Sequence, residues 1–234
     1  MRLRLASYNL HKCLGMDRRR KPARNAKVIA ALNADIVALQ EVDHRLGQRP
    51  AAMPMGLLER ATGLRVLAFA LDGPSLGWHG QTILVRPEIA PIALRRIVLP
   101  GLEPRGAVLA ELETRAGPLR VIGVHLGLVK RSRVMQLAAI RAAISHRPVM
   151  PTAILGDFND WSASGCGEHL APDFRLHAPG RTFPAPGPMG ALDRIAVGFG
   201  LHLIDAGTFQ APPARIASDH LPIWADVWIG SPDD

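Results

Sequence analysis

Ile154-Leu155-Gly156-Asp157-Phe158-Asn159 is an apolar run that ends abruptly in a carboxylate and an amide. Side chains two residues apart on a strand point to the same face, so Asp157 and Asn159 reach one face at the strand's end. Such a pair can hold a metal ion or a charged oxygen. A plain turn is the alternative interpretation of this stretch alone, because Gly, Asp and Asn are common turn residues.

Other apolar runs of the chain carry polar groups at their ends in the same way. Ser218-Asp219-His220-Leu221-Pro222 precedes a strand-like run, and residues 3–8, 35–40 and 119–124 are strand-like runs followed by polar groups. If these strands belong to sheets whose ends converge, the polar groups meet at one mouth, where the catalytic groups of a packed scaffold collect. The gathered set would be Asn9, Glu41, His125, Asp157, Asn159, Asp193, Asp219 and His220.

These strings, in this order, resemble the endonuclease/exonuclease/phosphatase superfamily, which includes pancreatic DNase, abasic-site endonucleases, inositol polyphosphate phosphatases and neutral sphingomyelinases. The resemblance covers nearly the whole chain. It is carried by Tyr8-Asn9 with His11, Gln40-Glu41-Val42, His125-Leu126-Gly127, Gly156-Asp157-Phe158-Asn159, Leu192-Asp193-Arg194 and Ser218-Asp219-His220-Leu221-Pro222. A branch of short bacterial proteins with no settled substrate is the most similar, through Tyr8-Asn9-Leu10-His11-Lys12, Pro104-Arg105-Gly106-Ala107 and Arg181-Thr182-Phe183-Pro184.

The pattern of predicted elements indicates an α/β fold. Periodicity and turn residues predict helices over 22–33, 55–62 and 132–146, and strands near 64–71, 80–86, 90–98, 106–114, 117–125, 191–198, 202–209 and 222–228. Residues 161–190 are rich in Gly and Pro and predict mostly loop. Strand runs interleaved with a few helices favour two packed sheets with helices outside. The resemblance implies a four-layer α/β sandwich, with two mostly antiparallel sheets flanked by helices, and we expect one catalytic domain over 1–234.

The chemistry of the strand ends favours a divalent metal site. Phosphoesters are anionic, so an attacking hydroxide is repelled unless cations and donors neutralise the phosphate oxygens. Glu41 supplies a hard carboxylate oxygen and Asn9 a neutral oxygen beside it, a set that suits Mg²⁺ or Mn²⁺ held largely by water. The resemblance adds Asp219 as a further carboxylate on the metal side.

The resemblance also implies the roles of the other groups. His220 would be the base or a stabiliser of charge, and Asp193 the carboxylate that fixes its tautomer. Asp157 would position or deprotonate the water, Asn159 would donate to the developing oxyanion, and His125 would contact the phosphate. Whether His220 or Asp157 takes the proton of the water stays open, as does the choice between one metal ion and two.

The net charge of +8, from 28 Lys and Arg against 20 Asp and Glu, favours an anionic partner. Arg18, within the basic loop 17–21, is either part of a clamp for substrate phosphates or a solvated residue at a helix start. The further candidates for phosphate contact are His11, Arg105 and Arg133. Fold alone cannot choose among nucleic acid, a phospholipid headgroup and a phosphorylated small molecule.

A compact phosphoester is the favoured substrate, ahead of duplex DNA. His11 stands where abasic-site endonucleases have a carboxylate, and aromatic residues make up only 5% of the chain, so platforms for base stacking are scarce. A nuclease acting on DNA or RNA is the alternative enzyme. The alternative outside catalysis is a phosphate-binding scaffold that kept the fold and lost the chemistry.

The cysteine pattern and the apolar runs predict a cytoplasmic protein. Cys13 and Cys166 predict free thiols in a reducing compartment, since no secretory segment or zinc-type spacing accompanies them. No apolar run approaches the ~18 residues of a membrane helix, although peripheral contact with phospholipid stays open. Residues 53–58 could form an apolar lip for a lipid, but a helix that buries one face is the favoured interpretation.

Overall fold

The computed structural model describes residues 1–71, 73–162 and 166–230, which form two six-stranded sheets. The first sheet has the order β11-β12-β1-β2-β4-β3 and the second β5-β6-β7-β8-β10-β9. The strands of the first sheet are β1 (Arg2–Asn9), β2 (Ile36–Gln40), β3 (Arg65–Val66), β4 (Gln81–Val85), β11 (Leu201–Thr208) and β12 (Ile223–Ile229). Those of the second are β5 (Ala90–Leu99), β6 (Arg105–Thr114), β7 (Gly117–His125), β8 (Thr152–Asp157), β9 (Phe174–His177) and β10 (Asp193–Gly198).

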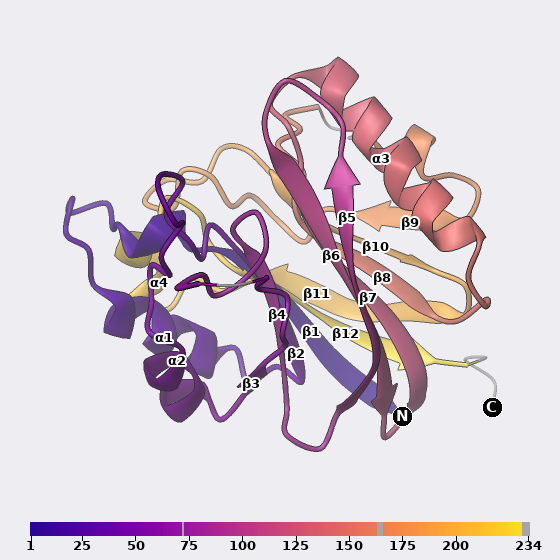
Figure 1. Ribbon diagram of the computed structural model, residues 1–234, viewed down its shortest axis with the longest axis horizontal. Helices are drawn as coiled ribbons and strands as arrows, with labels where there is room; N and C mark the ends of the chain where they lie inside the picture. The colour runs from indigo at the N-terminus through magenta and orange to yellow at the C-terminus, as the bar shows by residue number, and fades with distance from the viewer. Residues whose placement is uncertain (72, 163–165, 231–234) are drawn as a thin grey trace.

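Helices cover the outer face of each sheet, which makes four layers (Figure 1). The helices α1 (Pro22–Ala31), α2 (Met55–Thr62) and α4 (Ala214–Ala217) pack on the first sheet, and α3 (Lys130–Ser145) packs on the second. Between the sheets lies an apolar layer in which Leu5 and Ile36 of the first sheet belong to one cluster with Val121 and Leu155 of the second. The predicted α/β sandwich is therefore confirmed.

Both sheets are mostly antiparallel, as predicted, but each contains one parallel pair. The parallel pairs are β1 with β2 and β7 with β8. The carboxyl ends of two parallel strands meet at one edge, so Asn9 lies beside the end of β2, and His125 is paired with Asp157. The antiparallel neighbour β10 begins at the same edge, where Asp193 is opposite Asp157. Topology therefore brings the polar strand ends together.

A few elements differ from the sequence-based expectation. Only Arg65 and Val66 of the predicted strand 64–71 form a strand, β3. This strand pairs with the outer edge of β4. The strand β9 lies within the region predicted to be mostly loop, and the short helix α4 was not predicted. Both are only four residues long, too short to produce a clear periodic pattern.

The segment 53–58 packs into the protein. Met53 and Leu58 are fully buried in the cluster between the first sheet and its helices, so the interpretation of a helix with a buried face is confirmed. Cys13 and Cys166 are free thiols, as predicted, and both are buried. Within the described ranges, no helix is long and apolar enough to cross a membrane.

Candidate active site

Asp157, the last residue of β8, lies at the centre of the converging strand ends. Its side chain is buried, and its Oδ2 accepts a hydrogen bond of 3.0 Å from Nδ2 of Asn9 while Oδ1 accepts one of 2.9 Å from the backbone N–H of Asn159. Gly156 permits this close packing, since its φ is +150° and a Cβ there would lie 1.9 Å from the carbonyl oxygen of Val124. The Gly-Asp pair thus places a carboxylate where β7 and β8 end side by side.

His220 lies between two carboxylates. Its Nδ1 is 2.8 Å from Oδ2 of Asp193 and its Nε2 is 3.6 Å from Oδ2 of Asp157. The ring of Phe183 packs against the imidazole, with centroids 5.0 Å apart. The hydrogen bond to Asp193 fixes the orientation of the ring, so the other nitrogen is aimed at Asp157.

Burial and neighbouring charge set the protonation states of this pair. Burial raises the pKa of Asp157 to about 6, although the nearby His220 opposes this rise. Burial lowers the pKa of His220, but the carboxylates of Asp193 and Asp157 outweigh it and raise that pKa to about 10. At neutral pH, His220 is therefore an imidazolium and Asp157 a carboxylate.

His125, the last residue of β7, is the second imidazole of the site. Its Nε2 lies 3.4 Å from Oδ2 of Asp157. Burial, followed by the positive charges of Arg105 and His220, holds the pKa of His125 well below its usual range. The site therefore presents one neutral and one charged imidazole to the same carboxylate.

Glu41 follows β2 and turns sharply out of the sheet with a φ of 54°. Its carboxylate contacts Nζ of Lys12 and lies 3.6 Å from Nη2 of Arg45. Burial acts to raise the pKa of Glu41, but Lys12 and then Arg45 more than offset this, so the pKa is lowered. Glu41 is thus an ionised carboxylate that already attracts positive charge.

The donor set fits a hard divalent cation that keeps most of its waters. The carboxylate oxygens of Glu41 are paired with the cationic groups of Lys12 and Arg45. A metal ion would make the same kind of contact with these oxygens. Oδ1 of Asp219, which accepts from Oγ of Ser218 at 3.2 Å, is a second carboxylate at this edge, 3.7 Å from Nδ1 of His11. Across residues 1–71, 73–162 and 166–230, no group of three or more His, Cys, Asp or Glu is placed so that it could hold a metal ion. Carboxylate oxygens such as those of Glu41 are the ligands that Mg²⁺ and Mn²⁺ prefer.

Asn9 and Asn159 both make hydrogen bonds that organise the site. Oδ1 of Asn9 accepts from the backbone N–H of His11 at 3.1 Å, and its Nδ2 is committed to Asp157. Nδ2 of Asn159 donates to the carbonyl of Leu126 at 2.8 Å. One amide hydrogen of Asn159 remains for a substrate oxygen, while Asn9 holds Asp157 in place.

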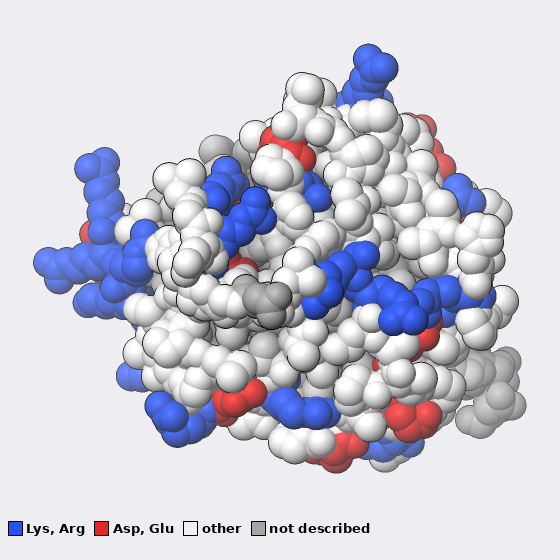
Figure 2. Space-filling model, viewed as in Figure 1, with Lys and Arg blue, Asp and Glu red and all other residues white. Residues whose placement is uncertain are grey.

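Arg105 and His125 line a hollow of about 120 Å³ beside Glu41. Lys and Arg side chains gather around a hollow in this face of the molecule, with acidic side chains among them (Figure 2). Arg105 is paired with Glu103 at 2.6 Å. Arg105 thus lies in this hollow, and its contact with a phosphate stays a prediction.

The structure places Arg133 and Arg18 differently from the prediction. Arg133 is buried at the start of α3, where Nη1 donates to the carbonyl of Leu128 at 2.7 Å and Nη2 lies 3.5 Å from Oδ1 of Asp160. Arg18 is on an exposed turn, and its backbone N–H bonds to the carbonyl of Gly15. Neither lines the hollow beside Glu41, so Arg133 has a structural role and Arg18 lies outside the site as described.

Sequence reasoning missed several residues of the site. The hollow is also lined by Lys12, Arg45, Arg49, His44 and His79. Lys12 lies inside the string of residues 8–12 that carries the resemblance, and Arg45 follows Glu41 by four residues. Closeness to candidate ligands was the available signal for these two, whereas Arg49 and His79 carried none.

Comparison with known proteins adds a family and a fold to this geometry. The model of the endonuclease/exonuclease/phosphatase family matches residues 6–220. An uncharacterized protein of Escherichia coli strain K12, YbhP, is 31% identical over 172 residues, which cover 65% of this chain and 64% of that protein. This chain thus aligns with less than two thirds of the length of YbhP.

Two solved structures show the same fold at low sequence identity. The mannosyl-6-phosphatase Bt3783 of Bacteroides thetaiotaomicron superposes with a TM-score of 0.76 at 17% identity, covering 96% of this chain and 99% of that one. D. rerio TDP2, complexed with a single-strand DNA product, gives a TM-score of 0.73 at 17% identity, covering 97% and 98%. With the match over residues 6–220, these findings show that the chain belongs to the endonuclease/exonuclease/phosphatase family.

Proposed function

We propose that this protein is a divalent-metal-dependent phosphoesterase that hydrolyses a phosphodiester or phosphomonoester by in-line attack of an activated water. The observation that carries the proposal is the arrangement around Asp157, whose Oδ2 lies 3.4 Å from one imidazole and 3.6 Å from another, beside the ionised Glu41. Titratable groups with strongly perturbed pKa values that meet in one place are typical of catalytic sites.

The protonation states support a different role for each of the two central groups. Asp157 has a pKa of about 6, so near neutral pH it is ionised and basic enough to accept a proton from water. The carboxylates of Asp193 and Asp157 raise the pKa of His220 to about 10, so it carries a proton near neutral pH, and we assign the role of base to Asp157. His220 instead stabilises the negative charge that develops on the phosphate oxygens. Asp193 is a positioning residue that keeps His220 charged and correctly oriented.

The remaining groups bind the phosphate and the metal. A cation bound by Glu41, with Asp219 nearby, would supply positive charge to a phosphate oxygen and to the leaving group. Neutral His125 donates or accepts a hydrogen bond to the substrate, Arg105 contacts a phosphate oxygen, and the second amide hydrogen of Asn159 faces the developing oxyanion. His11 lies near Asp219 and completes this side of the site.

The free-energy cost of burying charged groups argues against a scaffold without catalytic activity. Asp157, Asp193 and His220 are buried, and burying charged groups generally destabilises a fold unless they are fully paired. Oδ1 of Asp193 has no hydrogen-bond partner among the described residues. A buried charged cluster that destabilises the fold is explained by catalysis and not by its contribution to stability.

Among substrates, we favour a compact phosphoester over duplex DNA. Two observations support this choice: the hollow has a volume of only about 120 Å³, and a mannosyl-6-phosphatase has a similar fold. A nuclease is the second candidate, because TDP2 has the same fold and was solved with single-strand DNA product.

Purified enzyme assays test this proposal. With Mg²⁺ or Mn²⁺, we expect the protein to hydrolyse bis(p-nitrophenyl) phosphate, and to act on phosphorylated sugars or phospholipid headgroups better than on plasmid DNA. Excess EDTA should abolish turnover and added metal should restore it. Undiminished turnover in EDTA, with the metal content checked, would contradict the metal-dependent mechanism. Efficient nicking of plasmid with no turnover of small phosphoesters would make the protein a nuclease.

A further inference from the structure

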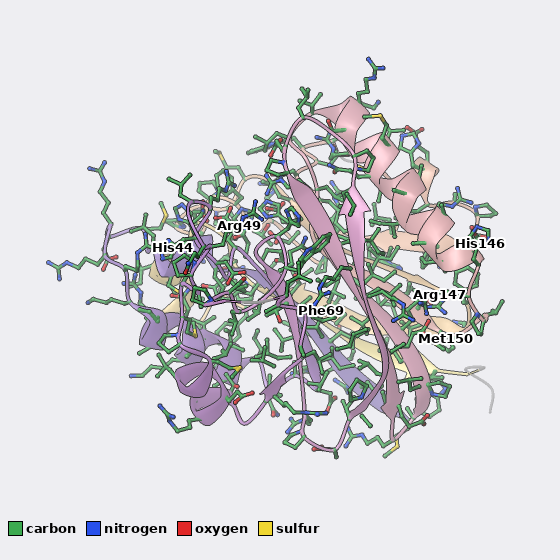
Figure 3. The ribbon with its side chains drawn as sticks, viewed as in Figure 1. His44, Arg49, Phe69, His146, Arg147 and Met150 are labelled. Atoms are coloured by element: carbon green, nitrogen blue, oxygen red, sulfur yellow. The ribbon has the colours of Figure 1, made fainter. Side chains whose placement is uncertain are left out.

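The hollow beside Glu41 extends from the reaction centre onto a loop that is firmly built. Residues 43–51 form a small hairpin closed by a bridge between Asp43 and Ala51. The buried carboxylate of Asp43 accepts from Oγ of Ser75 at 2.8 Å and from the backbone N–H of Leu76 at 2.6 Å. Figure 3 shows Arg49 on this loop, at the opposite end of the molecule from His146 and Arg147.

Arg49 brings a positive charge to the hollow. It lines the same hollow as His125, and its Nη1 lies 3.3 Å from Nδ1 of His79. Nδ1 of His79 also lies 3.1 Å from the carbonyl oxygen of Pro104. Burial lowers the pKa of His79, the hydrogen bond to Pro104 opposes this and the charge of Arg49 adds to it, so the pKa is lowered and His79 is neutral at neutral pH. Within the described part of the chain, Arg49 forms no ion pair.

The acids of the hollow are engaged by other groups. Glu41 is shared by Lys12 and Arg45, and Glu103 accepts from Arg105 and from the backbone N–H of Leu128. The carboxylate of Asp43 is used by the 75–77 segment. The charge of Arg49 is therefore available to an anion that enters the hollow.

A second arginine-lined cavity provides a contrast. It has a volume of about 480 Å³ and lies beneath the C-terminal part of α3. There Arg120 and Arg147 both bond to Oε1 of Glu111, and Arg141 pairs with Asp173 at 2.9 Å. Each of its three guanidinium groups contacts a carboxylate, although Arg120 and Arg147 share that of Glu111, whereas Arg49 contacts no carboxylate among the described residues.

We propose that Arg49, with His79, forms a second phosphate-binding subsite, so that the substrate is a small phosphoester carrying a second phosphate near the scissile one. This inference rests on the proposed function only in naming the substrate of that site. A guanidinium binds a phosphate through two parallel charge-assisted hydrogen bonds, which gives both energy and orientation. The neutral His79 supplies a further hydrogen-bonding group without repelling Arg49.

Binding without turnover tests the subsite directly. Calorimetry on the metal-free full chain in EDTA would compare glucose 1,6-bisphosphate with glucose 6-phosphate, and adenosine 3′,5′-bisphosphate with adenosine 5′-monophosphate. We expect at least one bisphosphate to bind about ten-fold more tightly than its monophosphate, the scale of one charge-assisted hydrogen bond. The pair that shows the preference distinguishes a sugar from a nucleoside as the body of the substrate.

A variant of Arg49 and a matched control test whether Arg49 causes the preference for bisphosphates. Arg49→Gln should reduce the ratio of the two dissociation constants to near one, and it should lower the dependence of bisphosphate binding on salt. Arg95→Gln is the control, because Arg95 is exposed on β5, and its Nη1 bonds to the carbonyl of Leu94. This control should keep the wild-type ratio.

Equal affinity of the wild type for both members of each pair would overturn the subsite. So would an Arg49→Gln variant that keeps the preference, or a control that loses it. These results are independent of hydrolysis. A protein that prefers bisphosphates but never cleaves a phosphoester would refute the proposed function and leave the subsite standing.

Discussion

The reaction centre and the rim of the hollow differ in how they are held. His125, Asp157, Asp193 and His220 are at most 5% exposed, and they come from strand ends or the segments next to them. The side chain of Arg45 on the rim is 65% exposed and comes from a loop. Buried groups on a rigid sheet keep the geometry that a reaction needs, whereas exposed loop residues can vary with the substrate. We therefore expect substitutions in the centre to change the rate of the reaction and substitutions on the rim to change the choice of substrate.

The largest effect should come from removing the charged imidazole. His220→Gln should lower kcat by about 10²-fold or more, the scale of a lost charge-stabilising group. Asp193→Asn should have a smaller effect, because the ring stays present but loses the carboxylate that orients and charges it. Steady-state kinetics with an activated ester, alongside circular dichroism to confirm folding, would measure both. A folded His220→Gln variant with near wild-type kcat would remove His220 from the centre.

Metal binding should respond in opposite directions to two substitutions. Glu41→Gln should weaken Mn²⁺ binding because the carboxylate is lost. Lys12→Met should strengthen it by about ten-fold, or about 1.4 kcal/mol, because the competing ammonium against Glu41 is removed. Electron paramagnetic resonance of free Mn²⁺ would give both affinities without any substrate. Weaker binding in Lys12→Met would show that Lys12 supports the metal site instead of competing for it.

A smaller effect, visible spectroscopically, separates the two imidazoles. In nuclear magnetic resonance titrations of the metal-free protein, His220 should remain protonated until about pH 10, while His125 should stay neutral well below its usual pKa. The raised pKa of His220 stabilises the fold fully below the ordinary value of 6.5, and this contribution is lost as the pH rises through about 10. Titration of His220 near 6.5 would contradict the role assigned to its charge.

The sequence predicted the centre because strand ends are readable. An apolar run followed by a carboxylate or imidazole marks a strand that delivers that group to an edge, as for Asp157 and His125. That the edges coincide depends on the two parallel pairs, which the sequence did not reveal by itself. The prediction of a common site took the convergence of the strand ends as a condition, and the two parallel pairs meet that condition.

The rim could not be predicted in the same way. Arg49 joins the hollow because Asp43 ties its loop to residues 75–77, a contact between segments that are distant in sequence. Arg133 follows His125 by only eight residues, yet the start of α3 turns its guanidinium toward the carbonyls of Gly127 and Leu128. Arg133 follows His125 and Arg49 follows Glu41 by the same eight residues, so distance in sequence could not tell which of the two lines the hollow.

The most direct test of the account compares the wild type with Asp157→Asn on bis(p-nitrophenyl) phosphate, with Mn²⁺ and with EDTA. Asparagine keeps the size of the side chain but removes the base. The account predicts metal-dependent turnover by the wild type and a loss of about 10²-fold or more in the folded variant, at saturating metal. Equal rates for the two proteins, or rates that EDTA leaves unchanged, would contradict it.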